Sequence, residues 1–310
     1  MIIAHGMEDK IREIEGILSR YLPEEQGQQK IIFEAVNYSL LAGGKRLRPI
    51  ILLETYRMFS KELNPRNEAI VEPFLVAMEM IHTYSLVHDD LPAMDNDQYR
   101  RGKLTTHAVY GEAMGILAGD ALLNLAYETA LTAFQIMEKN IGKEERIEWY
   151  QRIIRAMQLL AKNAGCAGMI GGQVVDVMNE NQELAKEQLD FIYDLKTGAL
   201  LRASFLIGAI LSGADEGKIL LVNRIAGNVG LAFQIQDDIL DVISTQEIFG
   251  KPIHSDEKNH KITYVTLYGI DQSKEMVSKL LKEAQSLLSE LQVDAKFMIE
   301  LVEYLITREK

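Results

Sequence analysis

Hydrophobic residues recur at three- and four-residue spacing along almost the whole chain. Residues 11–22, 31–44 and 276–291 show the spacing clearly, in the sequences IREIEGILSRYL, IIFEAVNYSLLAGG and MVSKLLKEAQSLLSEL. This spacing gathers apolar side chains on one face of an α-helix, whereas the sustained apolar and polar alternation of a half-buried strand is absent. The pattern predicts an all-α protein.

Short polar stretches separate the expected helices. They are KELNPRNE, NIGKEER, GADEG and EIFGKPIHSDEKNHK, at residues 61–68, 140–146, 213–217 and 247–261. The chain has only six prolines and no segment rich in serine, proline and glycine, so nothing indicates a linker between domains. We therefore predict one domain over residues 1–310.

Two glycines, Gly43 and Gly44, close the apolar segment at 31–44. Glycine suits the C-terminal end of a helix because it adopts the left-handed conformation without steric cost. The pair predicts a helix end and places three basic residues on the connection before Pro49: Lys45, Arg46 and Arg48.

Composition narrows the function classes. A hydrophobic share of 47% supplies a large core, and a formal net charge of −12 opposes non-specific binding of nucleic acid, so any anion site must be a local basic patch or a metal site. The single cysteine, Cys166, excludes an internal disulfide, and charge appears too early at the N-terminus for a secretory signal, which favours the cytoplasm. Charged and polar residues interrupt the apolar stretches 115–134 and 198–214, so we expect buried helices and no membrane span.

The first acidic cluster lies in HDDLPAMDND. Asp89 and Asp90 end an apolar helical stretch, and Asp89 falls nearly in line with Ser85 and His82. A helix that continued would point Asp95 away from them. Because the three carboxylates can converge only where the backbone departs from a regular helix, the sequence predicts a local break near Pro92.

The second cluster lies in FQIQDDILDVI. Asp237 and Asp241 are one helical turn apart and Asp238 adjoins them, which predicts a face of three carboxylates within an apolar segment. An isolated acidic run is more often a solvated helix face. Two such clusters on apolar helices instead call for a cation, because unpaired carboxylates are costly to bury. Ligands that are all oxygen favour Mg²⁺, which completes its octahedron with water and substrate phosphates.

Basic residues near the first cluster complement this interpretation. Arginine forms bidentate hydrogen bonds with phosphate, and lysine adds a compact positive charge. Acids and bases together therefore indicate one site for a polyanionic substrate, whose phosphates would be clamped by Arg100, Arg101, Lys45, Arg46 and Arg48.

An ordered set of motifs then resembles the trans-isoprenyl diphosphate synthases, in particular the bacterial farnesyl and short-chain group. From about Gly43 to Tyr264 the chain shows GGKRLRP, HDDLPAMDNDQYRRG, GGQVVD, KTGAL, FQIQDDILD and GK…HKITY. Each motif is weak by itself, but the ordered set is highly specific. The resemblance implies a bundle of mostly antiparallel helices around a deep central cavity, with the two aspartate motifs facing each other, in a homodimer.

The resemblance also implies roles for individual residues. The metal ligands, expected to hold three Mg²⁺ ions with the substrate diphosphate, are Asp89, Asp90, Asp95, Asp237, Asp238 and Asp241. Positions around the allylic diphosphate are Arg100, Lys196, Thr197, Gln234 and Lys251, with Gln173 and Asp176 near the same site. Positions for isopentenyl diphosphate are Lys45, Arg48, His82 and Arg101. Lys261 matches the lysine beside the second motif, while His254 and His260 replace glycines that are common in the family.

The implied reaction joins isopentenyl diphosphate to dimethylallyl or geranyl diphosphate by ionisation, condensation and proton elimination. In related enzymes an aromatic residue five positions before the first aspartate is typical of farnesyl-length products. Tyr84 holds that position, roughly 7.5 Å deeper along the helix than Asp89, and the small Ser85 beside it offers no block. The sequence thus favours a C15 product.

Three alternatives stay open. A geranylgeranyl or longer-chain synthase shares the catalytic motifs and differs at the cavity floor. A terpene cyclase shares the helical fold and the first aspartate motif, but GGKRLRP and DDILD are not expected in it. A non-catalytic partner subunit of a heteromeric synthase tends to lack some of the aspartates and arginines that this chain retains.

Overall fold

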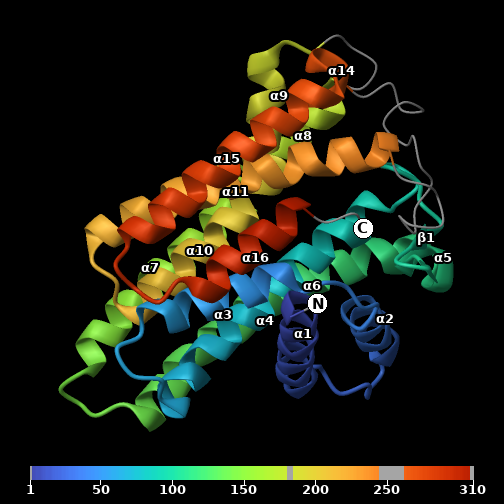
Figure 1. Ribbon diagram of the computed structural model, residues 1–310. Coiled ribbons are helices and arrows are strands. Elements are labelled where there is room, and N and C mark those ends of the chain that lie inside the picture. The colour runs from blue at the N-terminus through green and yellow to red at the C-terminus, as the bar shows by residue number, and fades with distance from the viewer. Residues whose placement is uncertain (1, 180–183, 244–261, 308–310) are drawn as a thin grey trace. The chain divides into compact units, whose positions relative to one another are not determined.

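The computed structural model describes residues 2–179, 184–243 and 262–307, and the described chain is almost entirely helical (Figure 1). This confirms the all-α prediction. The three segments with the clearest helical spacing lie in α1 (Ile2–Arg20), α2 (Lys30–Leu40) and α15 (Ile270–Glu290). The chain divides into two compact units, the first made of Met1–Ile50 and Leu63–Ile153 and the second of Ile51–Glu62 and Ile154–Lys310. Two helices contribute residues to both units, α3 (Leu47–Phe59) and α7 (Arg146–Ala164).

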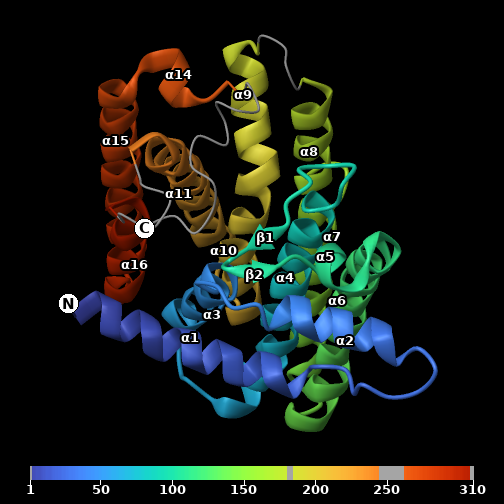
Figure 2. The same ribbon diagram turned by 90° about the vertical axis from the view of Figure 1, so that its right-hand side faces the viewer.

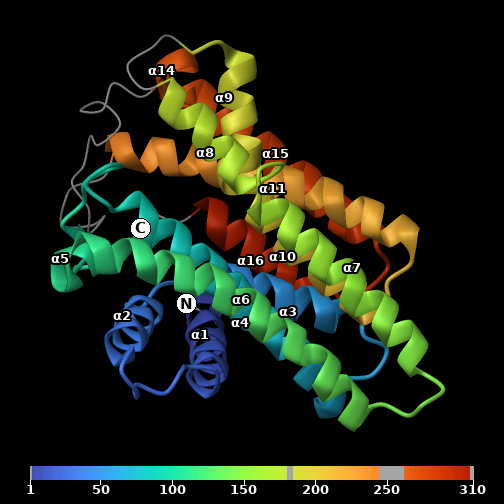
Figure 3. The ribbon, with the colours of Figure 1, turned by 180° about the vertical axis from the view of Figure 1, so that it is seen from behind.

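The first unit is built around two long helices that lie side by side (Figures 1 and 3). These are α4 (Pro65–Asp89) and α6 (Glu112–Asn140). They run antiparallel, because His88 Nε2 lies 3.0 Å from Ile116 O, while the Asn140 amide donates to Arg66 O. Gly119 makes this close packing possible, since a β-carbon there would lie 2.0 Å from the His88 ring. The short α5 (Thr106–Tyr110) precedes α6.

A turn and a small hairpin follow α4 (Figure 2). Helix α4 ends at Asp89, and the backbone N–H of Asp95 returns to Asp89 O at 2.9 Å. The hairpin pairs β1 (Tyr99–Arg100) with β2 (Lys103–Leu104), and both residues of its tip, Arg101 and Gly102, have positive φ. Positive φ at two central residues matches the twist of a tight hairpin. The predicted break near Pro92 is confirmed, and the hairpin carries the arginine pair.

The second unit contains antiparallel neighbours as well. Gln234 on α11 (Glu216–Ile243) accepts a hydrogen bond from Thr197, while Gly198 at the start of α10 (Gly198–Ser212) packs on Gly230. Helix α15 lies along α11 (Figures 1 and 3). The remaining elements are α8 (Met169–Met178), α9 (Lys186–Ile192), the π-helical turn η1 (Tyr193–Thr197), α14 (Tyr264–Tyr268) and α16 (Lys296–Thr307).

Two helical stretches of the described chain are long and apolar enough to cross a membrane, Pro65–Asp89 and Lys186–Ser212. Their most apolar windows are 78% and 72% buried inside the protein, respectively. Helices in the core of a protein have the same composition, because their side chains face other helices on most sides.

Candidate active site

The first aspartate motif sits where α4 gives way to the turn. Asp89 is half-buried on the last helical residue, Asp90 is 3% exposed, and Asp95 is exposed on the turn. Asn96, the next residue, has φ of +52°, a conformation that asparagine tolerates better than most residues. The helix break thus brings Asp95 back beside the helix end through its backbone, and the three carboxylates differ in their surroundings.

Asp90 is held by Arg100 from the hairpin. Arg100 Nε donates to both carboxylate oxygens, at 2.6 and 2.9 Å, and Asp97 Oδ2 lies 3.6 Å from the same guanidinium. Burial by itself lowers the pKa of Arg100, but the hydrogen bond and charge of Asp90 outweigh it and raise that pKa above its ordinary value. Two residues with predicted site roles are therefore in direct contact.

A second group of basic residues surrounds His82, about two helical turns before Asp89. Arg48 Nη1 lies 3.3 Å from His82 Nε2. Burial, and then the charges of Arg48, Arg101, Arg100 and Arg46, hold the pKa of His82 well below its usual range. His82 is thus a neutral imidazole among guanidinium groups, an environment that favours a bound anion.

The neutral His82 predicts how stability depends on pH. Unfolded histidine takes up a proton below about pH 6.5 whereas folded His82 does not, so the free energy of unfolding falls as pH decreases from about 6.5, by at most about 1.4 kcal/mol per unit. We expect urea unfolding between pH 7 and pH 5 to show this loss, and His82→Gln to remove it. The His88→Gln variant, outside the arginine group, should keep it; equal pH slopes in the wild type and His82→Gln would contradict the assignment.

The position of Arg46 contradicts its predicted role in clamping substrate phosphate. Its side chain is 1% exposed and its Nη1 donates to Glu79 at 2.7 Å, with Leu40 O accepting from Nη2 at 2.7 Å. The described structure thus turns Arg46 into the core of the first unit. Arg48 differs from expectation in a smaller way, because α3 begins at Leu47 and Arg48 lies in its first turn, while Lys45 remains on the connection.

The second aspartate motif lies near the C-terminal end of α11. Asp238 is 3% exposed, and its Oδ2 accepts from the Tyr193 hydroxyl at 2.6 Å and from the Tyr264 backbone N–H at 3.2 Å. Asp241 is also buried, whereas Asp237 is half-buried. Nothing in the sequence marked Tyr193 or Tyr264 as partners of the motif, since tyrosines at apolar positions are ordinary core residues.

The π-helical turn η1 presents the residues of the KTGAL motif. Lys196 Nζ donates to Asp176 on α8 at 2.6 Å, and the Thr197 hydroxyl donates to Gln234 at 2.6 Å. A β-carbon on Gly172 would lie 2.2 Å from Lys196 N, so only glycine permits this approach of α8. Single π-helical turns occur often at functional sites. Gln173, also predicted, lies on α8 one turn before Asp176.

The carboxylates of the two motifs can be tested for their fit to magnesium ions. Among the described residues, no group of three or more Asp, Glu, His or Cys side chains is placed to hold an ion. Asp237, Asp238 and Asp241 lie together on α11, and their role as metal ligands stays a prediction. Asp90 and Asp238 instead turn toward Arg100 and Tyr193. Mg²⁺ usually binds through one or two carboxylates and completes its shell with water and substrate phosphates, and an ionised carboxylate accepts about four hydrogen bonds or metal contacts. The motifs suit ions that bind with the substrate.

Tyr84 lies on α4 below the first motif. It is 6% exposed and packs edge-on against His88, with ring centroids 5.7 Å apart. Burial first, then Tyr127 and Asp89, raise the pKa of Tyr84 to about 12. The phenol is therefore a neutral, packed aromatic group at physiological pH, and Ser85 is a small neighbour whose hydroxyl donates to His82 O.

Four residues with sequence-based expectations lie outside the described residues: Lys251, His254, His260 and Lys261. Their expected roles stay predictions.

The sequence of this chain is similar to those of known proteins. A model of the polyprenyl synthetase family matches residues 29–301, across both units. The chain belongs to this family. A farnesyl diphosphate synthase of Geobacillus stearothermophilus is 40% identical over 303 residues, 98% of this chain and 97% of that protein. A geranylgeranyl diphosphate synthase of Cyanophora paradoxa is 41% identical over 296 residues, 95% of this chain and 93% of that protein.

A solved structure agrees with the sequence relatives. A geranyltransferase from Helicobacter pylori, complexed with magnesium and isoprenyl diphosphate, has a TM-score of 0.81 at 29% identity, over 99% of this chain and 97% of that one. The fold is therefore that of the isoprenyl diphosphate synthases. The chain is a short-chain prenyltransferase of the magnesium-dependent polyprenyl synthetase family, and its relatives include both farnesyl and geranylgeranyl synthases.

Proposed function

We propose that this prenyltransferase makes farnesyl diphosphate, adding isopentenyl diphosphate to dimethylallyl diphosphate and then to geranyl diphosphate. The observation that carries the C15 product is the packed aromatic ring of Tyr84, on the helix that ends at the first aspartate motif. A growing chain that runs down this helix from Asp89 meets the ring after about 7.5 Å of helix. The relatives of this chain include farnesyl and geranylgeranyl synthases, and we take the floor of the cavity as the feature that separates the two products.

The allylic diphosphate site draws residues from both motifs. We assign Asp89, Asp90 and Asp95 with Asp237, Asp238 and Asp241 to the metal ions, which we expect to number three. When bound, these ions supply positive charge to the diphosphate oxygens. Arg100 and Lys196 add charge where the leaving diphosphate gains it, and Thr197 and Gln234 orient hydrogen bonds around it. Each of these four already contacts an aspartate or another member of the set.

Isopentenyl diphosphate is assigned to the basic group at His82. Lys45, Arg48 and Arg101 bring positive charge to its diphosphate, and neutral His82 offers a ring nitrogen without a competing charge. As the allylic C–O bond breaks, the bond electrons leave with diphosphate. The double bond of isopentenyl diphosphate then attacks the allylic carbocation, and loss of a proton to the released diphosphate restores a double bond. Apolar surroundings exclude the water that would trap the cation.

We also propose that the enzyme is a cytoplasmic homodimer. Helix α6 supports the dimer, because Ile116, Leu117 and Leu131 are each between 43% and 49% exposed along its length. Exposed apolar side chains on one helix are typical of an interface between subunits. Light scattering should give about twice the chain mass of 35.0 kDa.

One assay tests the proposed function. Purified protein is incubated with Mg²⁺, isopentenyl diphosphate and dimethylallyl diphosphate, with and without a chelator, and dephosphorylated products are separated by chain length. We expect farnesol from the complete mixture and none with chelator, because the leaving diphosphate then lacks its counter-charge. Geranylgeraniol would contradict the C15 assignment while leaving the chemistry intact. Absence of prenyl product with any allylic starter would instead favour a non-catalytic partner subunit.

A further inference from the structure

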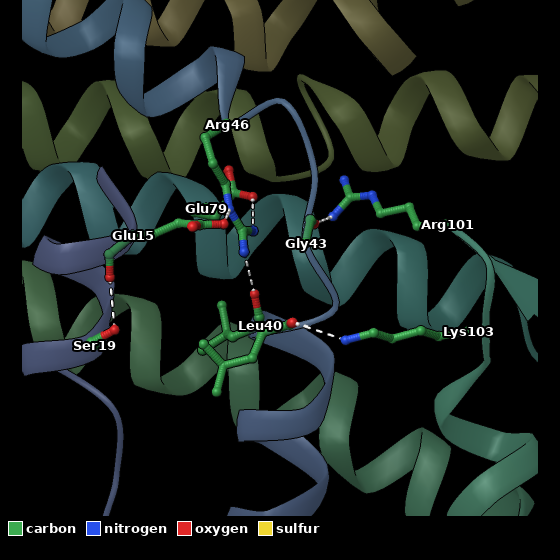
Figure 4. A network of polar contacts seen from close by, with 9 residues as sticks. Glu15, Ser19, Leu40, Gly43, Arg46, Glu79, Arg101 and Lys103 are labelled. Atoms are coloured by element: carbon green, nitrogen blue, oxygen red, sulfur yellow. Dashed lines mark hydrogen bonds and ion pairs between the residues drawn. The ribbon is translucent and has the colours of Figure 1, made fainter. Parts of the chain in front are cut away.

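A buried ion pair joins the basic loop after α2 to α4 (Figure 4). Arg46 Nη1 and Glu79 Oε1 are 2.7 Å apart, with side chains 1% and 2% exposed, and Arg46 Nη2 also donates to Leu40 O. Glu15 on α1 lies 3.8 Å from Arg46 Nε. The reaction proposed above uses neither Arg46 nor Glu79, although Arg46 lies between two residues assigned to isopentenyl diphosphate.

Cationic side chains hold the carbonyl groups of this loop. At the end of α2, Leu40 O accepts from Arg46, Leu41 O from Lys103 and Gly43 O from Arg101 (Figure 4). The last carbonyls of a helix lack partners within it, and basic side chains satisfy them and match the negative end of the helix dipole. Of the three cations, Arg46 alone is buried, so it fixes the loop from the inside.

The backbone at Arg46 is strained. Its φ is +48°, in the left-handed region that costs a residue with a β-carbon about 1–2 kcal/mol. Such a conformation persists where surrounding contacts determine it, and it is found most often at functional sites. Here the contacts are those of the Arg46 side chain itself, with Glu79 and Leu40 O.

Glu79, the partner of Arg46 on α4, lies close to the isopentenyl diphosphate residues in the sequence. Glu79 lies three residues before His82 on α4, so both side chains project from the same side of the helix. Arg48, two residues after Arg46, reaches His82 Nε2 at 3.3 Å. The buried pair and the Arg48–His82 contact therefore link the loop and the first turn of α3, in succession, to one stretch of α4.

We propose that Arg46 and Glu79 are positioning residues, which hold Lys45 and Arg48 in place for the diphosphate of isopentenyl diphosphate. This inference rests on the proposed function of the same site. A buried ion pair is weak evidence of stabilisation, because well-packed apolar residues of similar volume often serve stability as well or better. What apolar residues cannot do is hold Leu40 O and the loop in a single geometry, which the planar fork of arginine does.

The decisive variant replaces the pair by apolar residues, Arg46→Met with Glu79→Met. We expect this variant to unfold thermally close to the wild-type temperature. Its KM for isopentenyl diphosphate should rise about 10- to 100-fold, as for other residues that orient a binding group. Its KM for dimethylallyl diphosphate should stay within about twofold of the wild type. Arg46→Lys should restore part of the lost affinity. Arg46→Gly combined with Glu79→Met accepts the positive φ without the side chain and leaves no unpaired buried charge. It should behave like the Met double variant if the Arg46 side chain matters, and like the wild type if only the backbone does.

A control disrupts a more exposed ion pair, which joins α1 to α4. Arg20→Met with Glu72→Met removes a 2.6 Å pair away from the basic loop and should leave both KM values unchanged. A wild-type KM for isopentenyl diphosphate in the folded double variant, or an equal rise in both KM values, would overturn the positioning role. If the double variant does not fold, the two KM values of Arg46→Lys test the positioning role by the same criteria. Wild-type enzyme without prenyl product would overturn the proposed function and this inference together, whereas active wild type with unchanged variants would overturn the inference alone.

Discussion

The Asp90→Asn variant is expected to lose about 10³-fold in kcat, the upper range for removing one group that stabilises developing charge. Asparagine retains the shape of the side chain but not the charge that a metal ion requires. It also leaves the Arg100 guanidinium, hydrogen-bonded to Asp90 at 2.6 and 2.9 Å, without its counter-ion. Loss of a buried pairing costs about 3–5 kcal/mol of stability, so kcat should be measured well below the melting temperature.

A neighbouring carboxylate supplies the control for Asp90. Asp97 also lies near Arg100, at 3.6 Å, but it is not one of the three aspartates assigned to metal ions, and more of its side chain is exposed. Asp97→Asn should keep kcat within about threefold of the wild type, because a longer and better solvated ion pair contributes little. Similar losses in the two variants would mean that Arg100, and not metal binding by Asp90, accounts for the effect.

The Tyr84→Ala variant should make products of C20 or longer in place of C15. Removing the ring opens space on α4 below Asp89, and chain growth then continues until another side chain blocks it. The ring is 6% exposed, so its loss also costs stability, about 3–5 kcal/mol for a buried aromatic residue changed to alanine. Product analysis by chain length, at a temperature where the variant is folded, measures the shift.

Two conservative variants test the role of volume at this position. Tyr84→Phe keeps the ring against His88 and should still give C15, because only the hydroxyl is lost. Ser85→Ala removes a hydroxyl that donates to His82 O and should also leave chain length unchanged. A C15 product from Tyr84→Ala would place the floor of the cavity elsewhere.

Much of the local structure follows from the sequence because its causes are local. Helical spacing of apolar residues predicted α1, α2 and α15, and the polar stretches at 61–68, 140–146 and 213–217 fall where helices end or begin. Gly43 and Gly44 both adopt positive φ, but they lie beyond the C-cap Leu41, in the connection that follows α2. The break after Asp89 was predictable because the carboxylates of one motif could not otherwise converge.

Partners that are distant in the chain were not predictable. Arg46 and Arg48 look alike within GGKRLRP, yet Arg46 is buried against Glu79 while Arg48 contacts His82. The direction in which each side chain points depends on a left-handed residue and on a glutamate 33 positions away. Likewise, the tyrosines that hold Asp238 come from a π-helical turn and from α14, which no spacing in the sequence relates to the motif.

The sequence by itself determined the class of fold, several of the places where helices end or begin, the family and the chemical types gathered for a diphosphate substrate, because these depend on periodicity and on ordered motifs. Only the tertiary structure decided which acid faces which base. Asp90 binds Arg100, Asp176 binds Lys196 and Glu79 binds Arg46, over separations of 10, 20 and 33 residues. The physical reason is that a buried charge needs a partner wherever the packing of helices provides one, and that packing is a property of the whole fold.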